Sequence, residues 1–582
     1  MTTFAVLLVL VLAAGCRTPT GQPAPAPTPG DNRARALADA YLDGYFERNP
    51  ELATYYGVRG RRHDRLGDNS PGALKAWQSK EDAWLTQARA IGSATIAAAP
   101  LKATHAIVRE TLESGVAARA CRTELWNVSQ MTGWHVQLGY LVTIQPVGTD
   151  EARAEALARW QSLPRFIDTE IENLREGLKL GYSAPKGIAG IVIDQMNTLI
   201  SSPAADSPFM SPAQRDKTPG FHKAWESLVT EDLTPAFIRY RDFLRKEYLP
   251  AARTAIAVAA IPMGSECYRA SVRVYSTLTV PAREIHELGL RRMDELMAEM
   301  KTIAERSFGT SDVQGLLRTL RTDRRYLFKD REELIERSKA ALGRAKAAAP
   351  DTFGLLATSG VIIQPYPKFR EKNAPNEYNP PAEDGSRPAI FLISAYQAEQ
   401  KSKAGAESTT FHETIPGHHL QVAIALERRE IHPIGRYLFN SGYVEGWALY
   451  AERLADEMNL YSSDLDRLGM LSLQAFRAAR LVVDPGMHAL GWTRQQAIDY
   501  MLAHTTEEPA GVASEIDRYI IWPGQATSYM MGMTEIRRLR DEAQQKLGPK
   551  FDIKAFHDRI LEDGSVPLTF LGTKVRAWIG AS

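Results

Sequence analysis

Helical periodicity runs through most of the chain and constrains its fold more than any other feature. Apolar residues recur three or four positions apart in many segments, and several of these segments end at Gly or Pro. This spacing places the apolar side chains on one face of an α-helix. Clear examples are residues 34–50, 150–181, 280–309 and 444–461. The sequence therefore predicts a mostly α-helical protein.

Strand patterns are few, and the clearest is PAIFLISAY, Pro388–Tyr396, which follows a turn-rich segment. Residues 32–582 contain no second linker rich in Pro, Gly or Ser and no internal repeat. We therefore expect residues 32–582 to form a single helical domain, with two lobes around a deep cleft and a small β element beside the site.

The N-terminus carries the pattern of an exported protein. The apolar stretch before Cys16 is too short to span a bilayer and is typical of a signal peptide, residues 1–15. Its ending, LAAGC, resembles a bacterial lipobox, in which Cys16 becomes the lipidated first residue. No Lys or Arg follows Met1 and Ala13 replaces the commoner Leu, so ordinary secretory cleavage is the alternative.

Residues 16–31 are polar and rich in Pro, and they predict an extended tether to a membrane. Since Arg17 is not Asp, we expect an outer-membrane lipoprotein that faces the periplasm. Export would place Cys121 and Cys267 in an oxidising compartment, where they form either a disulfide or two buried thiols. Lys and Arg total 70 against 69 Asp and Glu, without a basic run interleaved with aromatics, so nucleic acid is not an expected partner.

One stretch, TTFHETIPGHHLQ at 409–421, resembles a zinc-protease helix with altered spacing. In HExxH two histidines four apart bind zinc, and the Glu between them is the general base. In a regular helix His412 and His418 would be about 600° apart, and His412 and His419 about 10 Å apart along the axis. A regular helix therefore excludes a shared ion.

Pro416 and Gly417 lie between these histidines and should interrupt the helix, so that His412 and His418 converge beside Glu413. His419 would then support the site or face the substrate. The alternative is a capping box, in which Thr410 caps a helix and Glu413 reaches back to it. A third ligand is available in Glu445, unless Glu445, Glu452 and Asp456 form only a solvated acidic face.

These motifs resemble a known family. HETIPGHHLQ, EGWALYAE, RAARLVVDPGMHALGWTRQQAIDYM, YIIWPGQATSYMMG and CRTELWNVSQMTGW together resemble the bacterial domain of unknown function 885 family, in which many members are lipoproteins. More remotely, the order HE, GH, a carboxylate and a Gly- and Tyr-rich segment is similar to helical zinc peptidases related to thimet oligopeptidase and angiotensin-converting enzyme. The resemblance implies a zincin-like body.

Carried over to this chain, the resemblance implies one zinc ion bound by His412, His418 and Glu445, with Glu413 as general base. Oxyanion donors would be His488 and Tyr529, with Tyr519 as a second choice. The additional Pro-Gly departs from those peptidases and leaves open whether His418 or His419 is the ligand.

Arg477 and Arg480, three positions apart, are candidates to bind a peptide's C-terminal carboxylate, or else to form structural ion pairs. We thus expect a zinc peptidase that cuts peptides or peptide-like amides. The alternatives are a metal-dependent amidase or esterase with a non-peptide substrate, and a binding lipoprotein without turnover.

Overall fold

The structure is a computed structural model that describes residues 26–203, 206–366, 371, 376–381 and 387–581. The predicted signal peptide, Cys16 and residues up to 25 lie outside the described residues. The tether is shorter than predicted, because α1 begins at Pro29 and not after residue 31. Thr28 and Asp31 form a capping box that starts the helix early. None of the described helices has the length and apolar character needed to cross a membrane.

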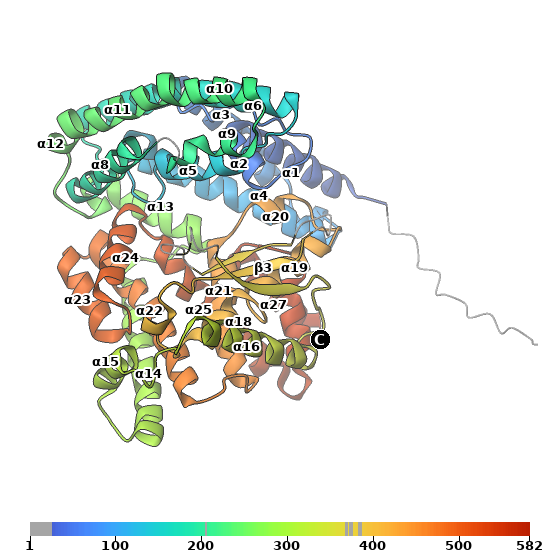
Figure 1. Ribbon diagram of the computed structural model, residues 1–582. Coiled ribbons are helices and arrows are strands. Elements are labelled where there is room, and N and C mark those ends of the chain that lie inside the picture. The colour runs from blue at the N-terminus through green and yellow to red at the C-terminus, as the bar shows by residue number, and fades with distance from the viewer. Residues whose placement is uncertain (1–25, 204–205, 367–370, 372–375, 382–386, 582) are drawn as a thin grey trace, which may run out of the picture.

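The N-terminal half of the chain forms an upper layer of helices, blue to green in Figure 1. The predicted helix at 150–181 is divided in two, because Pro164 begins a new helix after Gln161. The α-helices of this half are α1 Pro29–Arg48, α2 Pro50–Tyr55, α3 Pro71–Ala90, α4 Ala99–Ala118, α5 Trp134–Ile144, α6 Asp150–Gln161, α7 Leu163–Lys179, α8 Lys186–Ser201, α9 Ser211–Arg215, α10 Pro219–Ser227, α11 Thr234–Phe243, α12 Leu249–Ala251 and α13 Gly264–Ser276.

The C-terminal half forms a second layer below it, and this layer contains the sheet (Figure 1). The predicted helix at 280–309 is α14, Ala282–Phe308, which is capped by Gly309 in the left-handed region. The other helices are α15 Val313–Thr322, α16 Arg331–Thr352, α18 Ala406–Glu413, α19 His418–Glu427, α20 Ile434–Tyr437, α21 Ser441–Glu457, α22 Asp464–Ala489, α23 Arg494–His504, α24 Pro509–Ile521, α25 Ser528–Leu547, α26 Ile553–Leu561 and α27 Leu568–Ala581.

Helix α13 joins the two layers. It packs against α4 of the upper layer and against α21 and α25 of the lower layer. A disulfide between Cys121, which follows α4, and Cys267 on α13 fixes it to the upper layer. Of the two alternatives predicted for these cysteines, a disulfide or two buried thiols, the structure contains the disulfide.

The small β element is a three-stranded sheet made of β1 Val361–Pro365, β2 Glu377–Asn379 and β3 Ala389–Ile393. Its order is β1-β3-β2, with β3 parallel to β1 and antiparallel to β2. The predicted strand is therefore the central one, and both of its edges are paired. A peptide cannot extend the sheet through β3, and only β1 and β2 present edges.

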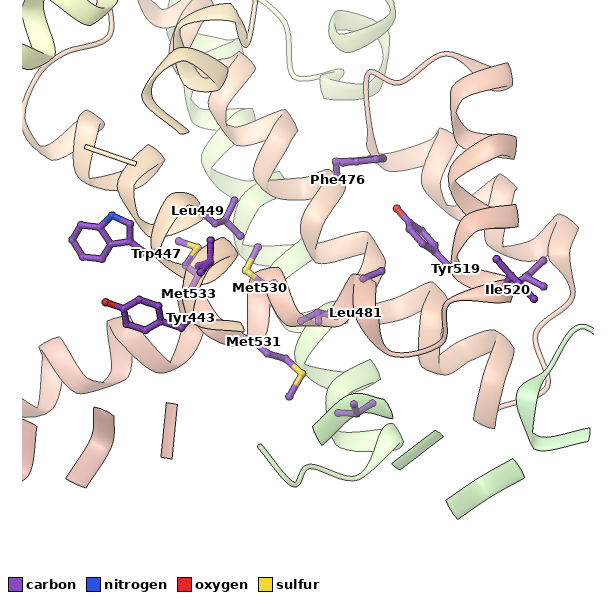
Figure 2. Packing of buried hydrophobic residues seen from close by; sticks show 14 of the residues in the cluster. Tyr443, Trp447, Leu449, Phe476, Leu481, Tyr519, Ile520, Met530, Met531 and Met533 are labelled. Atoms are coloured by element: carbon purple, nitrogen blue, oxygen red, sulfur yellow. The ribbon is translucent and has the colours of Figure 1, made fainter. Parts of the chain in front are cut away.

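Helices α21 and α25 cross with their backbones in contact. This crossing brings α25 close to the part of α21 that carries Glu445. A Cβ on Gly532 would be 1.7 Å from the carbonyl oxygen of Gly442, and one on Gly446 would be 2.5 Å from the carbonyl carbon of Gly532. Around this crossing Tyr443 and Trp447 of α21 and the methionines of α25 are buried in the core (Figure 2). Glycine is therefore required at this crossing.

Candidate metal centre

The helix that carries His412 stops at Glu413, and a new helix begins at His418. The Ile415–Pro416 peptide bond in this turn is cis. A Cβ on Gly417 would lie 1.9 Å from the carbonyl oxygen of His412, so the turn closes on the helix end only with glycine at this position. The predicted interruption is present. The capping box is wrong, because Thr410 lies inside α18 and donates to the carbonyl oxygen of Ala406.

This turn brings His412 and His418 together with Glu445 of α21. The Nε2 atoms of His412 and His418 are each 3.6 Å from Oε2 of Glu445, and the two rings lie 4.7 Å apart at 86°. Trp447 of the same helix donates to the carbonyl oxygen of Pro416 at 2.9 Å and thereby attaches the turn to α21. Among the described residues these three are the group that could hold a metal ion.

The spacing fits a metal ion better than it fits direct hydrogen bonds. Hydrogen-bonded nitrogen and oxygen atoms lie about 2.7–3.2 Å apart. Two ligand atoms at about 2.0–2.1 Å from one zinc ion in a tetrahedral site lie about 3.4 Å apart, close to the spacing seen here. The side chains of Glu445 and His418 are 23% and 11% exposed, so a small molecule can reach the cluster from solvent.

The charges within the cluster favour cation binding. Burial alone would raise the pKa of Glu445, but His412 and His418 hold it well below its usual range. Burial would lower the pKa of His412, but the carboxylates of Glu445 and Glu452 prevail and raise it to about 9. A metal ion must therefore displace a proton from His412, as is usual for histidine ligands.

Glu452 is the site residue that sequence reasoning missed. It is fully buried, and its Oε1 accepts from Nδ1 of His412 at 2.7 Å. Its Oε2 accepts from Gln474 at 3.0 Å. A carboxylate behind a ligating histidine fixes the tautomer that presents Nε2 to the metal. The sequence feature that could have identified Glu452 is its position two turns after Glu445, on the same helix face.

The solvated acidic face is therefore wrong for this helix, because Glu452 is inside the protein and Asp456 is paired with Arg467. Packing of α22 against α21 covers the face on which Glu452 lies.

We predict that Glu452→Gln raises the Kd for zinc about 10- to 100-fold, because loss of such a carboxylate weakens metal binding by that factor. The new amide also presents a donor to Gln474. Competition titration with a fluorescent zinc chelator measures the change. The matched control is Glu457→Gln on the same helix, where the carboxylate pairs with Arg540 away from the cluster. Equal affinity in Glu452→Gln and wild type would contradict a supporting role.

Glu413 ends α18 directly after His412 and is half-buried. No hydrogen bond or ion pair engages its carboxylate within the part of the chain that the structure describes. An uncommitted carboxylate next to a metal ligand is free to exchange a proton with a bound reactant.

His419 does not join the cluster, and both of its ring nitrogens are engaged within the protein. It is buried, its Nε2 donates to the carbonyl oxygen of Ser359 at 3.0 Å, and Nδ1 accepts from the hydroxyl of Tyr378 at 3.2 Å. Burial lowers its pKa to about 4, in keeping with this neutral tautomer. The Tyr378 ring, on β2, in turn stacks on that of His418 at 6.4 Å. His419 therefore links His418 to the sheet, a connection that the sequence did not indicate.

The predicted oxyanion donors separate into one with an uncommitted hydroxyl and two whose polar atoms are already hydrogen-bonded. Tyr529 is half-buried on α25, and after burial the nearby Glu445 carboxylate is the next cause that raises its pKa. It therefore stays protonated and can donate a hydrogen bond. No hydrogen bond engages its hydroxyl among the described residues.

His488 is wrong as an oxyanion donor. It is fully buried, Nδ1 accepts from the amide of Val258 at 3.0 Å, and Nε2 donates to the carbonyl oxygen of Tyr519 at 2.9 Å. Both nitrogens are thus used in joining α22 to its neighbours. The hydroxyl of Tyr519, whose ring lies in the core (Figure 2), accepts from Arg480 at 2.8 Å and donates to Glu515 at 2.6 Å, so it too is committed.

Arg480 forms an ion pair, as one alternative predicted, and its partner is Glu515 of α24. Arg477 donates to the carbonyl oxygen of Leu473 at 3.3 Å. It has no carboxylate within 4.0 Å in the described ranges. The two arginines therefore differ in their partners.

Known proteins share this fold and sequence pattern. The crystal structure of a "putative lipoprotein" from Colwellia psychrerythraea is 26% identical, with a TM-score of 0.87, and covers 95% of this chain and 100% of its own. The structure of "a putative lipoprotein of unknown function" from Shewanella oneidensis is 16% identical, with a TM-score of 0.75 over 92% of this chain and 98% of its own, and shows the fold alone. No curated protein matches the chain. The model of the family described as "Bacterial protein of unknown function (DUF885)" matches residues 50–575, so the chain belongs to this family.

Proposed function

We propose that the protein is a zinc-dependent hydrolase, and more specifically a peptidase that cuts peptides or peptide-like amides. The observation that carries this proposal is the convergence of His412, His418 and Glu445 at metal-ligand spacing, with the uncommitted carboxylate of Glu413 beside them. Two histidines and one glutamate form a ligand set typical of catalytic zinc, which keeps an open position, while structural zinc has four protein ligands.

In this proposal the ion supplies the Lewis acidity that makes a water molecule nucleophilic near neutral pH. Glu413 takes the proton from the attacking water and returns it to the leaving amine, which an amide requires because an amide anion is a poor leaving group. Glu452 keeps the His412 ring in the orientation that presents Nε2.

Tyr529 is the donor for the oxyanion that develops on the carbonyl oxygen. Its hydroxyl is protonated and has no hydrogen-bond partner among the described residues, and it approaches Glu445 because α25 crosses α21 at glycine. Such a preorganised donor stabilises developing charge strongly, since it needs no reorganisation during the reaction. The order of ligands, base and tyrosine along the chain supports the similarity to helical zinc peptidases, as does the mostly helical fold.

The same proposal includes export and anchoring. The apolar N-terminus and the LAAGC ending support lipidation of Cys16, and the lipoproteins of Colwellia and Shewanella are similar over most of the chain. The molecule would then be held at the outer membrane on the periplasmic side by the Pro-rich tether.

The test is metal-dependent hydrolysis by purified wild-type protein. Peptide mixtures are incubated with the protein, and products are identified by mass spectrometry. We predict cleavage that 1,10-phenanthroline abolishes and that added zinc restores, because the ligands cannot activate water without the ion. A parallel panel of esters and non-peptide amides tests the amidase and esterase alternative.

Cleavage that survives complete removal of metal would contradict a zinc mechanism. Metal binding without turnover of any peptide, ester or amide in the panel would favour the binding lipoprotein instead.

A further inference from the structure

Three arginines of α22 and α24, Arg477, Arg480 and Arg518, lie near Tyr529. The guanidinium carbon of Arg480 is 4.6 Å from the centre of the Tyr529 ring and 4.6 Å from that of Phe476. Arg518, on α24, shares the carboxylate of Glu515 with Arg480. Arg477 lies one helical turn before Arg480 on α22, next to the ring of Phe476.

Two of these arginines share one carboxylate. Glu515 accepts from Arg480 at 3.1 Å, from Arg518 at 3.0 Å and from the Tyr519 hydroxyl at 2.6 Å, so one anion serves two cations. Burial raises the pKa of Glu507, the carboxyl group on which Arg477 and Arg480 act electrostatically. Asp484 is the acidic group on which Arg518 acts in the same way.

Two of the guanidinium groups also have unused donors. Nε of Arg477 and Nη1 of Arg480 are buried and have no hydrogen-bond acceptor in the part of the chain that the structure describes. Arg480 as a whole side chain is 8% exposed. Buried donors without acceptors are costly and uncommon, so such a pair indicates a place where a ligand supplies the acceptor.

The location connects these arginines to the proposed chemistry. Arg477, Arg480 and Glu445 all lie near enough to Tyr529 to act on its hydroxyl electrostatically. Arg477 is half-buried, so one of the arginines can be reached from solvent. A peptide held with its scissile carbonyl at Tyr529 can therefore place a nearby anionic group at the arginines.

We propose that Arg477 and Arg480 bind the free C-terminal carboxylate of a peptide substrate, which makes the protein an exopeptidase or a dipeptidase and not an endopeptidase. This inference rests on the proposed hydrolase function. A planar carboxylate accepts two hydrogen bonds from guanidinium donors and supplies the acceptors that Nε of Arg477 and Nη1 of Arg480 lack. The carboxylate of a Glu or Asp side chain has the same chemistry and is the other source to be tested.

The experiment compares three sets of tripeptides offered to full-length wild type: free acids, C-terminal amides, and amides that end in Glu. Loss of each peptide is followed by mass spectrometry. We expect the free acids to be cut about 30-fold faster than either amide set, in line with the strength of charge-assisted hydrogen bonds. Arg477→Gln should bring the ratio of acid to amide cleavage close to one, and Arg477→Lys should retain part of it.

The control variant is Arg494→Gln, which removes an arginine of α23 that pairs with Asp517 and should keep the full preference. Thermal melting shows whether each variant is folded. Binding of trialanine and trialaninamide to the Glu413→Gln protein, measured by calorimetry, tests the same preference without turnover.

The outcomes separate this inference from the proposed function. Cleavage of acids and amides at equal rates would overturn the carboxylate subsite while leaving the hydrolase intact. Preference for amides that end in Glu would overturn the C-terminal assignment in favour of an acidic side chain. If no peptide is cut, the hydrolase proposal fails, and equal binding of trialanine and trialaninamide would then overturn the subsite as well.

Discussion

Glu413→Gln is expected to lower kcat for peptide hydrolysis by about 10²- to 10⁴-fold, which is the usual contribution of a general base. The substitution keeps the size and shape of the side chain but removes the group that accepts a proton from water. KM should change little, because Glu413 is not placed to hold the substrate in the ground state. Steady-state kinetics with the best peptide from the screen measures both constants.

The metal content of the variant shows whether a loss of activity comes from loss of the base or from loss of the ion. Since Glu413 is not one of the three ligands, the variant should retain as much zinc as wild type, as measured by inductively coupled plasma mass spectrometry. The matched control is Glu430→Gln, an exposed carboxylate paired with Arg428, which should keep full activity. A Glu413→Gln protein that holds zinc and still turns over at the wild-type rate would exclude this residue as the base.

His412→Ala and Glu445→Ala are expected to lose the metal. The wild-type protein, purified without added metal or chelator, should carry about one zinc ion per chain, and each variant less than about a tenth of that, because a three-ligand site loses most of its binding free energy with any one ligand. His412→Ala also leaves Oε1 of the buried Glu452 carboxylate without its histidine partner. The measurement is metal content by mass spectrometry of the intact preparation.

Two controls keep this result interpretable. His504→Ala removes a half-buried histidine at the end of α23 that bonds only to its own helix, and Glu457→Ala removes a carboxylate from the same helix as Glu445. Both should retain the ion. Wild type without metal even after zinc is offered, or ligand variants with undiminished metal, would mean that the cluster is not a zinc site.

The helical architecture and the break between the histidines could be predicted because their causes are local. Periodicity of apolar residues marks a helix within a few turns, and Pro416 with Gly417 ends one whatever surrounds it. The convergence of His412 and His418 follows from that break. Glu445 could be proposed because it is one of few acidic groups in a suitable position, although its distance from the histidines depends on the whole fold.

The roles of Glu452, His419 and His488 could not be predicted, because each is decided by a contact distant in sequence. Gln474 and the packing of α22 keep Glu452 out of water, Tyr378 of a short strand fixes His419, and the amide of Val258 occupies His488. The sequence shows the same histidine or glutamate whether that residue binds a metal, supports a ligand or packs in the core. Only the distances between chain segments distinguish these roles.

The disulfide between Cys121 and Cys267 has a consequence for how the protein responds to proteolysis. It closes a ring of chain whose ends are 146 residues apart, and this ring contains most of the upper layer from α5 to the start of α13. A protease that cuts one exposed loop in the ring releases no fragment, since both pieces stay joined through sulfur. The nicked protein remains one covalent unit, with the helix that joins the two layers still attached to both.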